Sequence, residues 1–386
     1  MAETFEGFLQ RHVEAETFPG AVLVGSRPGE SWEDSTVVCA GSMSLEGPPM
    51  PPDAIVRIES MTKPITAAAA LIAVQEGSLS LGDPVHRWLP ELDHRQVLRA
   101  PGAELDDVVP AIRDITVRDL LVNGSGYGME VTDSPLFRRM VELEISGHPD
   151  PPANVGADEW LRRLATLPLA HQPGEGFRYH HSFSLLGILL QRMSGVSLQD
   201  HLERVLFGPL GMVDTGLWVP PEKAFRLPAA LHRIDGELQE TELIGGGRYV
   251  GEPSVDTAHG ELVSTARDYL AFARMLADGG RHGGGQVLDP ALVAEMTRDQ
   301  VTLQAKTPES MLPGFWDTAG WGYGLSVVTA GDHPGRLGWV GGQGTSFFID
   351  PDGTIVIFLS QVEPDELMWA AFEEVHDLVP GPGLPE

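Results

Sequence analysis

The segment Arg57–Gly77, RIESMTKPITAAAALIAVQEG, determines how the rest of the chain is interpreted. Its second half is an alanine-rich apolar run, which is typical of a buried helix. Pro64 is tolerated only near the start of a helix, so this helix is expected to begin close to Ser60. A hydroxyl there lies near unpaired backbone N–H groups and the positive end of the helix dipole, which favour developing negative charge. Ser60 is therefore a candidate nucleophile.

Lys63 follows Ser60 by about one helical turn on the same face and can reach its hydroxyl. A short Ser-x-x-Lys match also fits a simpler alternative, in which Ser60 caps the helix and Lys63 is a solvated charge. The composition favours catalysis, because only three of the 26 basic residues are lysines: Lys63, Lys223 and Lys306. Arginine cannot give up its proton, whereas a desolvated lysine can.

The overall composition excludes several classes of protein. The chain has 386 residues and a formal net charge of −29, which disfavours binding to nucleic acid or to an anionic membrane. The longest apolar run, Ala67–Val74, is far shorter than the roughly 18 residues of a membrane span. Acidic residues in Met1–Gln10 stand where a signal peptide would be basic, so we expect a cytoplasmic protein. Cys39 is the only cysteine, which leaves no intrachain disulfide and predicts a small buried side chain.

Both ends of the chain predict β-hairpins. Near the N-terminus, Ala21–Ser26 and Thr36–Ala40 are Val-rich runs on either side of a polar stretch. Near the C-terminus, Thr345–Ile349 and Thr354–Ser360 flank the strong turn sequence Asp350–Gly353. Between these ends, apolar spacing of three and four residues predicts helices at Asp158–Leu167, Phe183–Met193, Leu198–Leu206, Thr265–Ala277 and Pro290–Met296.

This order of elements predicts an α+β fold, in which an antiparallel sheet from both chain ends is flanked by helices and carries a mainly helical insertion. The expected sheet domain comprises residues 1–80 and 250–386, and the expected helical domain comprises residues 81–249. The active site is expected in the cleft between them. Residues 380–386, rich in Pro and Gly, are expected to be a disordered tail.

Several further segments carry a family resemblance. Taken in chain order, the stretches that match are Ser60–Pro64, Leu79–Val85, Ile115–Gly126, Gln172–Gly174 with Tyr179, Gly211–Thr215 and Leu262–Leu270. Together they resemble the serine β-lactamase and penicillin-binding-protein superfamily, particularly its class C-like esterase branch, the family VIII-type carboxylesterases. The resemblance covers nearly the whole chain and implies a β-lactamase/transpeptidase-like fold.

The resemblance implies a role for Tyr179. In such enzymes the tyrosine at this position works with the lysine to take the serine proton and deliver it to the leaving group. His181 stands where asparagine is common and is expected to line the substrate pocket, as is Tyr127 in a nearby loop. The adjacent His180 and His181 could also suggest a metal site, but no third ligand has a recognisable spacing, and we expect none.

The stretch Trp339-Val340-Gly341-Gly342 stands where the family carries Lys-Thr-Gly or a relative. The resemblance implies that the backbone N–H groups of Ser60 and Gly342 form the oxyanion hole. Trp339 and Val340 replace the cation and hydroxyl that hold a substrate carboxylate in β-lactamases. This change favours neutral esters.

The sequence therefore predicts a serine hydrolase that cleaves small-molecule carboxylic esters without a cofactor. A β-lactamase, a D-amino-acid peptidase, an acyltransferase to an alcohol and a non-catalytic binding protein remain as alternatives. No Gly-x-Ser-x-Gly, P-loop, Gly-x-Gly-x-x-Gly or His-Glu-x-x-His motif supports another enzyme class. The natural substrate and the oligomeric state are open.

Overall fold

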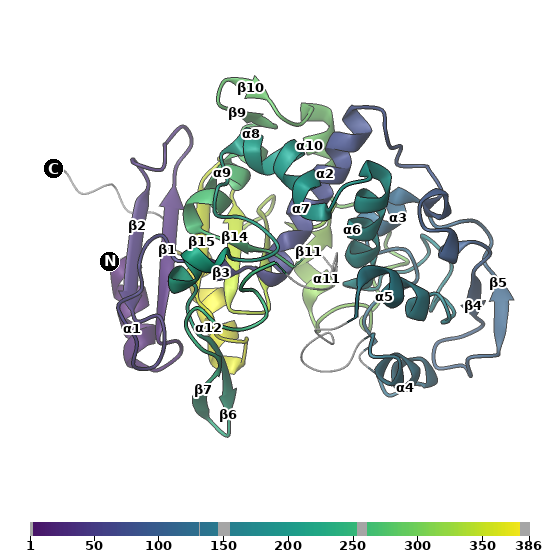
Figure 1. Cartoon of the computed structure of the whole chain (residues 1–386), viewed down its shortest axis with the longest axis horizontal. Coiled ribbons are helices and arrows are strands. Elements are labelled where there is room, and N and C mark those ends of the chain that lie inside the picture. Colours follow the sequence, from purple (N-terminus) through teal and green to yellow (C-terminus); the bar gives the residue numbers. More distant parts are fainter. Residues whose placement is uncertain (1–2, 131, 146–154, 253–260, 379–386) are drawn as a thin grey trace.

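A seven-stranded antiparallel sheet forms the centre of the structure, a computed structural model that describes residues 3–130, 132–145, 155–252 and 261–378. The strand order is β11-β12-β13-β14-β15-β1-β2. The strands are β1 (Gly20–Ser26), β2 (Thr36–Gly41), β11 (Ala319–Trp321), β12 (Ser326–Val328), β13 (Leu337–Gly341), β14 (Thr345–Ile349) and β15 (Ile355–Leu359). Because β15 pairs with both β14 and β1, the two chain ends build one sheet (Figure 1), which confirms the predicted fold class.

Both predicted hairpins are present. Wherever a strand end differs from the prediction, it is shifted by a single residue. The pair β1 and β2 forms the N-terminal hairpin, and β14 and β15 form the C-terminal one. In the C-terminal turn, the Gly353 N–H donates to the Asp350 carbonyl at 2.8 Å, and Gly353 has a φ of 86°. A glycine suits this position because positive φ strains residues that carry a Cβ.

The sheet is buried on both faces, which explains why its central strands are apolar throughout. In β1, Val22 and Val24 point into the main core, whereas Ala21 and Leu23 point into a second cluster on the opposite face. The second cluster is covered by α1 (Phe5–Glu14) and α12 (Glu366–His376). Side chains alternate between the faces of a strand, so two buried faces require a continuous apolar run.

The helix predicted to begin near Ser60 is α2 (Thr62–Gln75), preceded by a 3-10 turn, Glu59–Met61. The alanines from Ala67 to Ala70 are fully buried, and their small side chains let neighbouring helices approach closely. Helix α2 contacts α6 (His181–Ser194) and α10 (Pro290–Met296). It lies between the sheet and the helices of the insertion (Figure 1).

The five other predicted helices are present, with one change of geometry. Residues 198–206 form α7 followed by a π-helical turn, Glu203–Phe207, rather than one continuous α-helix. The remaining helices are α3 (Val117–Leu121), α4 (Pro135–Glu142), α5 (Ala157–Leu164), α7 (Leu198–Leu202), α8 (Gly208–Leu210), α9 (Ala266–Ala277) and α11 (Phe315–Thr318). No helix of the described residues has the length and apolar character that a membrane span requires.

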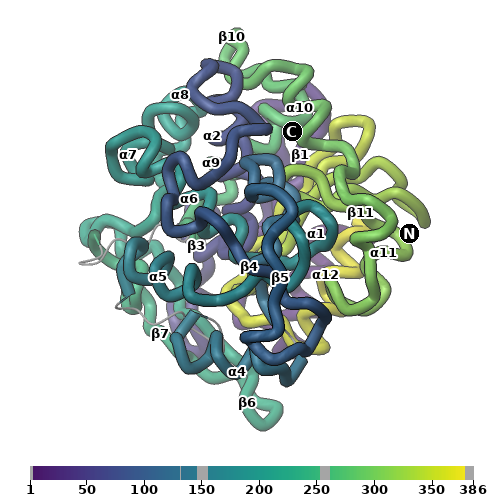
Figure 2. The backbone as a smooth tube through the Cα atoms, turned by 90° about the vertical axis from the view of Figure 1, so that its right-hand side faces the viewer, coloured from purple at the N-terminus to yellow at the C-terminus, as the bar shows by residue number. Residues whose placement is uncertain are grey.

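The region predicted as the helical insertion also contains two short hairpins: β4 (Gln96–Leu98) with β5 (Val108–Pro110), and β6 (Ala230–Ile234) with β7 (Glu237–Glu242). Figure 2 views the molecule from the side of α5, β4 and β5. The second hairpin contacts the segment that follows β15, since the Leu231 N–H donates to the Gln361 carbonyl at 2.9 Å. The division into residues 1–80 with 250–386 and residues 81–249 stays a prediction, and the expected tail at 380–386 lies outside the described residues. The short strands are β3 (Val56–Arg57), β4 (Gln96–Leu98), β5 (Val108–Pro110), β6 (Ala230–Ile234), β7 (Glu237–Glu242), β8 (Val263–Ser264), β9 (Arg281–His282) and β10 (Gly285–Gln286).

Candidate active site

Ser60 and Lys63 are in direct contact at the start of α2. The Lys63 Nζ donates to the Ser60 Oγ at 2.8 Å, and Lys63 is only 3% exposed. Met61, rather than Ser60, occupies the N-cap position of α2, and it makes no side-chain cap hydrogen bond. The alternative of a capping serine beside a solvated lysine therefore does not describe this site.

Tyr179 lies on the other side of Lys63. The Lys63 Nζ is 4.8 Å from the centroid of the Tyr179 ring, so the lysine nitrogen lies over the face of the tyrosine. The Trp339 Nε1–H donates to the Tyr179 hydroxyl at 2.7 Å. The family resemblance gave no reason to expect this hydrogen bond, which holds the tyrosine oxygen at one wall of the site.

The backbone is strained beside both Ser60 and Tyr179. Glu59, just before the serine, has a φ of 47°, and His180, just after the tyrosine, has φ 89° and ψ −72°. Non-glycine residues in such conformations are sparse and cluster at functional sites. In both cases the strain occurs where the chain turns to present a candidate catalytic side chain.

A cleft of about 670 Å³ opens over these residues. Ser60, Tyr179 and the stretch Trp339–Gly342 line the cleft; Gly342 directly follows the last residue of β13. Lys63 is buried next to the serine. The structure thus brings together Ser60, Lys63, Tyr179 and the stretch Trp339–Gly342. The cleft is also lined by residues that sequence reasoning missed, among them Met129, Phe177, Met311, Leu312, Pro313 and Trp369.

Tyr127 and His181 do not line this cleft, contrary to the prediction. Both are buried and lie beside a separate, much smaller cavity. The Tyr127 hydroxyl donates to the Leu167 carbonyl at 3.4 Å, and burial raises the pKa of Tyr127 to about 12. The ring of His181 packs against Trp160 with centroids 5.7 Å apart. The backbone turns at His180, so the side chain of His181, the first residue of α6, points into the interior and away from Tyr179.

The described residues that line the cleft include no unpaired cation. Arg178 is the only arginine or lysine among them, and its Nη1 pairs with the Glu130 Oε2 at 2.7 Å. Burial lowers the pKa of the lining residue His171, which favours its neutral form. The site is therefore better suited to a neutral substrate than to an anionic one.

A cluster of aromatic rings packs against Tyr179. Trp321 lies 5.8 Å from the Tyr179 ring and 4.6 Å from the Trp339 ring, measured between centroids. Phe177 and Phe315 extend this cluster through their contacts with the tryptophans. No spacing rule links these rings in the sequence, because they come from different elements.

A candidate metal-binding group lies elsewhere. Within the described residues, the group with suitable ligand spacing is His86, Asp93 and Asp114, of which both carboxylates are exposed. None of these residues lines the cleft. The pair His180 and His181, considered in the sequence as a metal site, is not part of the group.

Cys39 is half-buried in β2, and burial raises the pKa of its thiol to about 11. The thiol is therefore unreactive at neutral pH, because the thiolate is the nucleophilic form.

Comparisons with known proteins identify the family of the chain. A family model described as Beta-lactamase matches residues 5–368. Protein Rv1367c of Mycobacterium tuberculosis is 39% identical over 331 residues, covering 83% of this chain and 80% of the relative. Esterase EstB of Burkholderia gladioli is 29% identical over 367 residues, covering 91% and 87%. The solved structure of EstCE1, described as a hydrolase with promiscuous acyltransferase activity, has a TM-score of 0.78 at 24% identity and covers 97% of each chain. The chain belongs to the beta-lactamase family and is a serine hydrolase.

Proposed function

We propose that this protein hydrolyses neutral carboxylic esters through an acyl-enzyme formed on Ser60. The observation that carries the proposal is the 2.8 Å hydrogen bond from the Lys63 Nζ to the Ser60 Oγ at the floor of the cleft. A nucleophile needs an adjacent group that can take its proton, and a buried lysine supplies one once it is neutral.

The contacts support a division of roles between Lys63 and Tyr179. Lys63 touches the serine directly and takes its proton as the Ser60 Oγ attacks the ester carbonyl carbon. The Tyr179 oxygen accepts from Trp339, which leaves its own O–H free to give a proton to the departing alcohol oxygen. The proton held by Lys63 then restores Tyr179. Water then attacks the carbonyl carbon of the acyl-enzyme and gives up a proton, which Lys63 and Tyr179 pass to the departing Ser60 Oγ, and the carboxylic acid is released.

The backbone N–H groups of Ser60 and Gly342 are the proposed oxyanion hole. Both residues line the cleft. Amide donors fixed by the fold stabilise the negative charge that develops on the carbonyl oxygen, at no cost of reorganisation during the reaction.

Two features support a neutral ester over a β-lactam or a peptide carboxylate. Trp339 and Val340 form an apolar wall, and the Arg178 guanidinium is paired with Glu130. The relative named Esterase EstB points to the same reaction. Transfer of the acyl group to an alcohol is a second candidate, because a cleft of about 670 Å³ leaves room for an acceptor beside a short acyl chain.

The decisive experiment compares Ser60→Ala with the control variant Ser78→Ala. Ser78 lies just beyond the other end of α2, and its hydroxyl donates to the Ala73 carbonyl. Hydrolysis of p-nitrophenyl butyrate should fall to background in Ser60→Ala and stay near wild type in Ser78→Ala, with both proteins folded by circular dichroism. Nitrocefin and a D-Ala-D-Ala peptide test the alternatives, and added methanol detects transfer as a methyl ester. Retained hydrolysis in folded Ser60→Ala would exclude the proposal.

A further inference from the structure

Glu59 is a strained residue directly before the nucleophile, and the reaction described above does not use its side chain. Its φ of 47° lies in the left-handed region, which suits glycine and strains a residue that carries a Cβ. The glutamate side chain is only 16% exposed and is not among the described residues that line the cleft. A strained backbone persists only where surrounding contacts hold it, so the contacts of Glu59 show what maintains this turn.

The peptide bond between Glu59 and Ser60 carries the Ser60 N–H, one of the two proposed oxyanion donors. Rotation about the backbone torsions of Glu59 therefore turns this N–H, because the peptide group moves as one plane. The Glu59 Cβ also lies 4.0 Å from where a Cβ on Gly342 would stand, which places Glu59 next to the second proposed donor. The conformation of Glu59 thus decides whether the two donors converge on one point.

The backbone just before Glu59 is fixed by contacts of its own. The Ile58 N–H donates to the Leu262 carbonyl at 3.0 Å. The Ile58 carbonyl accepts from the Met61 N–H at 3.0 Å and from the Thr345 hydroxyl at 3.3 Å. The strained φ lies between this fixed peptide and the nucleophile, so a restraint on the Glu59 side chain acts directly on the strained bond.

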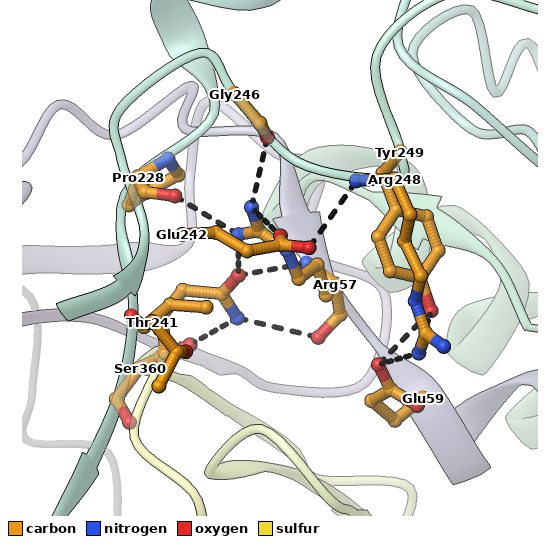
Figure 3. Close-up of polar contacts among 11 residues, drawn as sticks. Arg57, Glu59, Pro228, Thr241, Glu242, Gly246, Arg248, Tyr249 and Ser360 are labelled. Carbon is orange, nitrogen blue, oxygen red and sulfur yellow. Dashed lines mark hydrogen bonds and ion pairs between the residues drawn. The ribbon is translucent and has the colours of Figure 1, made fainter. Parts of the chain in front are cut away.

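The side chain of Glu59 is held by Tyr249 and Arg248. The Tyr249 hydroxyl donates to the Glu59 Oε1 at 3.0 Å, and the Arg248 Nη2 lies 3.5 Å from the same oxygen (Figure 3). The Arg248 Nη2 also donates to the Tyr249 hydroxyl oxygen at 3.2 Å, and the guanidinium lies 4.9 Å from the centroid of the tyrosine ring. Each of the three side chains therefore contacts the other two, and Tyr249 is only 4% exposed.

The loop that carries this tyrosine and arginine is tied back to the strand that leads to the nucleophile. Arg57, which is 1% exposed, pairs with the Glu242 carboxylate at 2.6 Å and donates to the Gly246 carbonyl at 3.4 Å. The other oxygen of Glu242 accepts from the Arg248 backbone N–H at 3.2 Å. Contacts thus run from Arg57 through the loop and return to Glu59, two residues further along the chain (Figure 3). This ring of contacts restricts movement of the loop relative to the nucleophile.

We propose that Glu59 is a positioning residue, whose carboxylate, held by Tyr249 and Arg248, keeps the left-handed turn that aims the Ser60 N–H at the substrate carbonyl oxygen. Glu59 acts through Ser60 and does not touch the substrate. A donor that the fold holds in place stabilises the oxyanion without reorganisation, whereas a turn that is free to relax points its N–H elsewhere for part of the time. The inference rests on the proposed oxyanion role of the Ser60 N–H.

The first test measures hydrolysis of p-nitrophenyl butyrate by variants that lack the anchor. Glu59→Ala and Glu59→Gly both remove it, and glycine adopts a positive φ without strain, so the second variant tests the anchor without a cost to folding. In both, kcat/KM should fall about 10–100-fold through kcat, while KM stays near the wild-type value. Tyr249→Phe removes only the donor to Glu59 and should lower kcat/KM about 3–10-fold. Wild-type kinetics in Glu59→Ala and Glu59→Gly would overturn the proposal.

Glu59→Gln should restore most of the activity. Glutamine keeps an oxygen that accepts from the Tyr249 hydroxyl, so kcat/KM should stay within about threefold of the wild type. A loss as large as in Glu59→Ala would mean that the negative charge matters and not the anchored conformation, which also overturns the proposal.

Glu16→Ala is the matched control. Glu16 is an exposed glutamate with a similar φ of 55°, so its replacement makes the same chemical change in the same backbone region away from the cleft. Its kcat/KM should equal that of the wild type. An equal loss in Glu16→Ala would count against a specific role for Glu59.

The second test reads the oxyanion directly. A trifluoromethyl ketone with a short acyl chain adds to Ser60 and places a negative oxygen where the transition state has one. Its Ki should rise in each variant by the same factor by which kcat/KM falls. A fluorophosphonate allowed to react to completion should still label all molecules of each variant by intact mass. An unchanged Ki together with incomplete labelling would show that Glu59 only maintains the fold.

Failure of the proposed function would look different. In that case Ser60→Ala would still hydrolyse the ester, or the wild type would react with neither the fluorophosphonate nor the ketone. An inactive Ser60→Ala and a fully labelled wild type, together with wild-type kinetics in Glu59→Ala and Glu59→Gly, would overturn the role of Glu59 alone.

Discussion

Gly341 and Gly342 are neighbours in sequence but meet different surroundings. A Cβ on Gly341 would overlap the Ile58 carbonyl and the Thr345 hydroxyl, whereas a Cβ on Gly342 would meet nothing closer than the Glu59 Cβ at 4.0 Å. The fold therefore requires glycine at position 341. At position 342 the space that glycine leaves is available to a substrate.

This contrast predicts opposite phenotypes for two alanine substitutions. Gly341→Ala should lower stability by about 1–3 kcal/mol, because backbone and a buried hydroxyl must move. Gly342→Ala should keep the wild-type melting temperature but lower kcat/KM at least about tenfold, equivalent to about 1.4 kcal/mol of transition-state stabilisation. Urea unfolding and ester kinetics on both variants check this. Unchanged kcat/KM in Gly342→Ala would argue against its place at the oxyanion.

The hydrogen bond from the Trp339 indole to Tyr179 can be tested by substituting Trp339 and, as a matched control, Trp321. The Trp339 Nε1 donates to Tyr179, whereas the buried Trp321 Nε1 has no hydrogen-bond partner among the described residues. Trp339→Phe should lower kcat by about 10–100-fold through loss of a hydrogen bond of about 1.5–3 kcal/mol to a reacting hydroxyl. Trp321→Phe removes a similar volume and should affect thermal stability more than kcat. Equal losses of kcat would mean that packing alone explains both.

At this scale the sequence predicted which candidate side chains come together but not what surrounds them. Ser60 and Lys63 stood out through their helical spacing and the scarcity of lysine, and Tyr179 through the family resemblance. The bond from Trp339 to Tyr179 was not predictable, because it joins elements that meet only in three dimensions. Tyr127 was misplaced because a loop residue near a motif can face either way. Its burial beside Leu167 is decided by packing that no local pattern encodes.

Helix α12 carries a half-buried histidine, His376, that links stability to pH. Burial lowers the pKa of His376 from about 6.5 to about 4, and the nearby Arg336 contributes to the decrease. Between these pH values the unfolded chain binds the proton more readily than the folded chain. The stabilising contribution is therefore complete above about pH 6.5 and is lost as the pH falls toward 4.

We expect His376→Gln to have a shallower loss of stability in acid than the wild type. The full difference corresponds to roughly 3 kcal/mol in the free energy of unfolding. Urea denaturation at about pH 7 and about pH 4.5 measures it. His94→Asn is the control, because His94 is 92% exposed and asparagine tolerates its φ of 49°. Identical acid sensitivity in His376→Gln and the wild type would refute the assignment.

The sequence predicted elements best where one pattern dominates. The strands of both hairpins and the helix α10 were predicted nearly residue by residue, because alternation or helical spacing ends there at clear turn residues. The π-helical turn Glu203–Phe207 was not predicted, since its apolar spacing resembles that of an α-helix. Trp369 of α12 reaches the cleft although nothing in its neighbourhood marks it as a site residue.

The net charge of −29 acts on the molecule as a whole. Like charges on a compact surface repel one another, and salt screens that repulsion over a Debye length of about 10 Å at 0.1 M. Raising NaCl from low concentration to about 0.3 M should raise the melting temperature by about 1–2 °C, equivalent to roughly 1 kcal/mol. A lower melting temperature in salt would show that the surface ion pairs outweigh the general repulsion. KCl at the same ionic strength controls for the identity of the cation.

The insertion of β15 between β14 and β1 has a consequence for biosynthesis. The hairpin of β1 and β2 leaves the ribosome long before Ile355–Leu359 (β15), the strand that joins it to the rest of the sheet. Ser60 and Lys63 are likewise made long before Trp339 of β13 and before Gly342, which follows that strand. The nascent chain must therefore remain without its complete sheet and cleft until β15 has left the ribosome. A ribosome that stops before β15 would release a polypeptide with an open strand edge, a substrate for chaperones and proteases rather than a partly active enzyme.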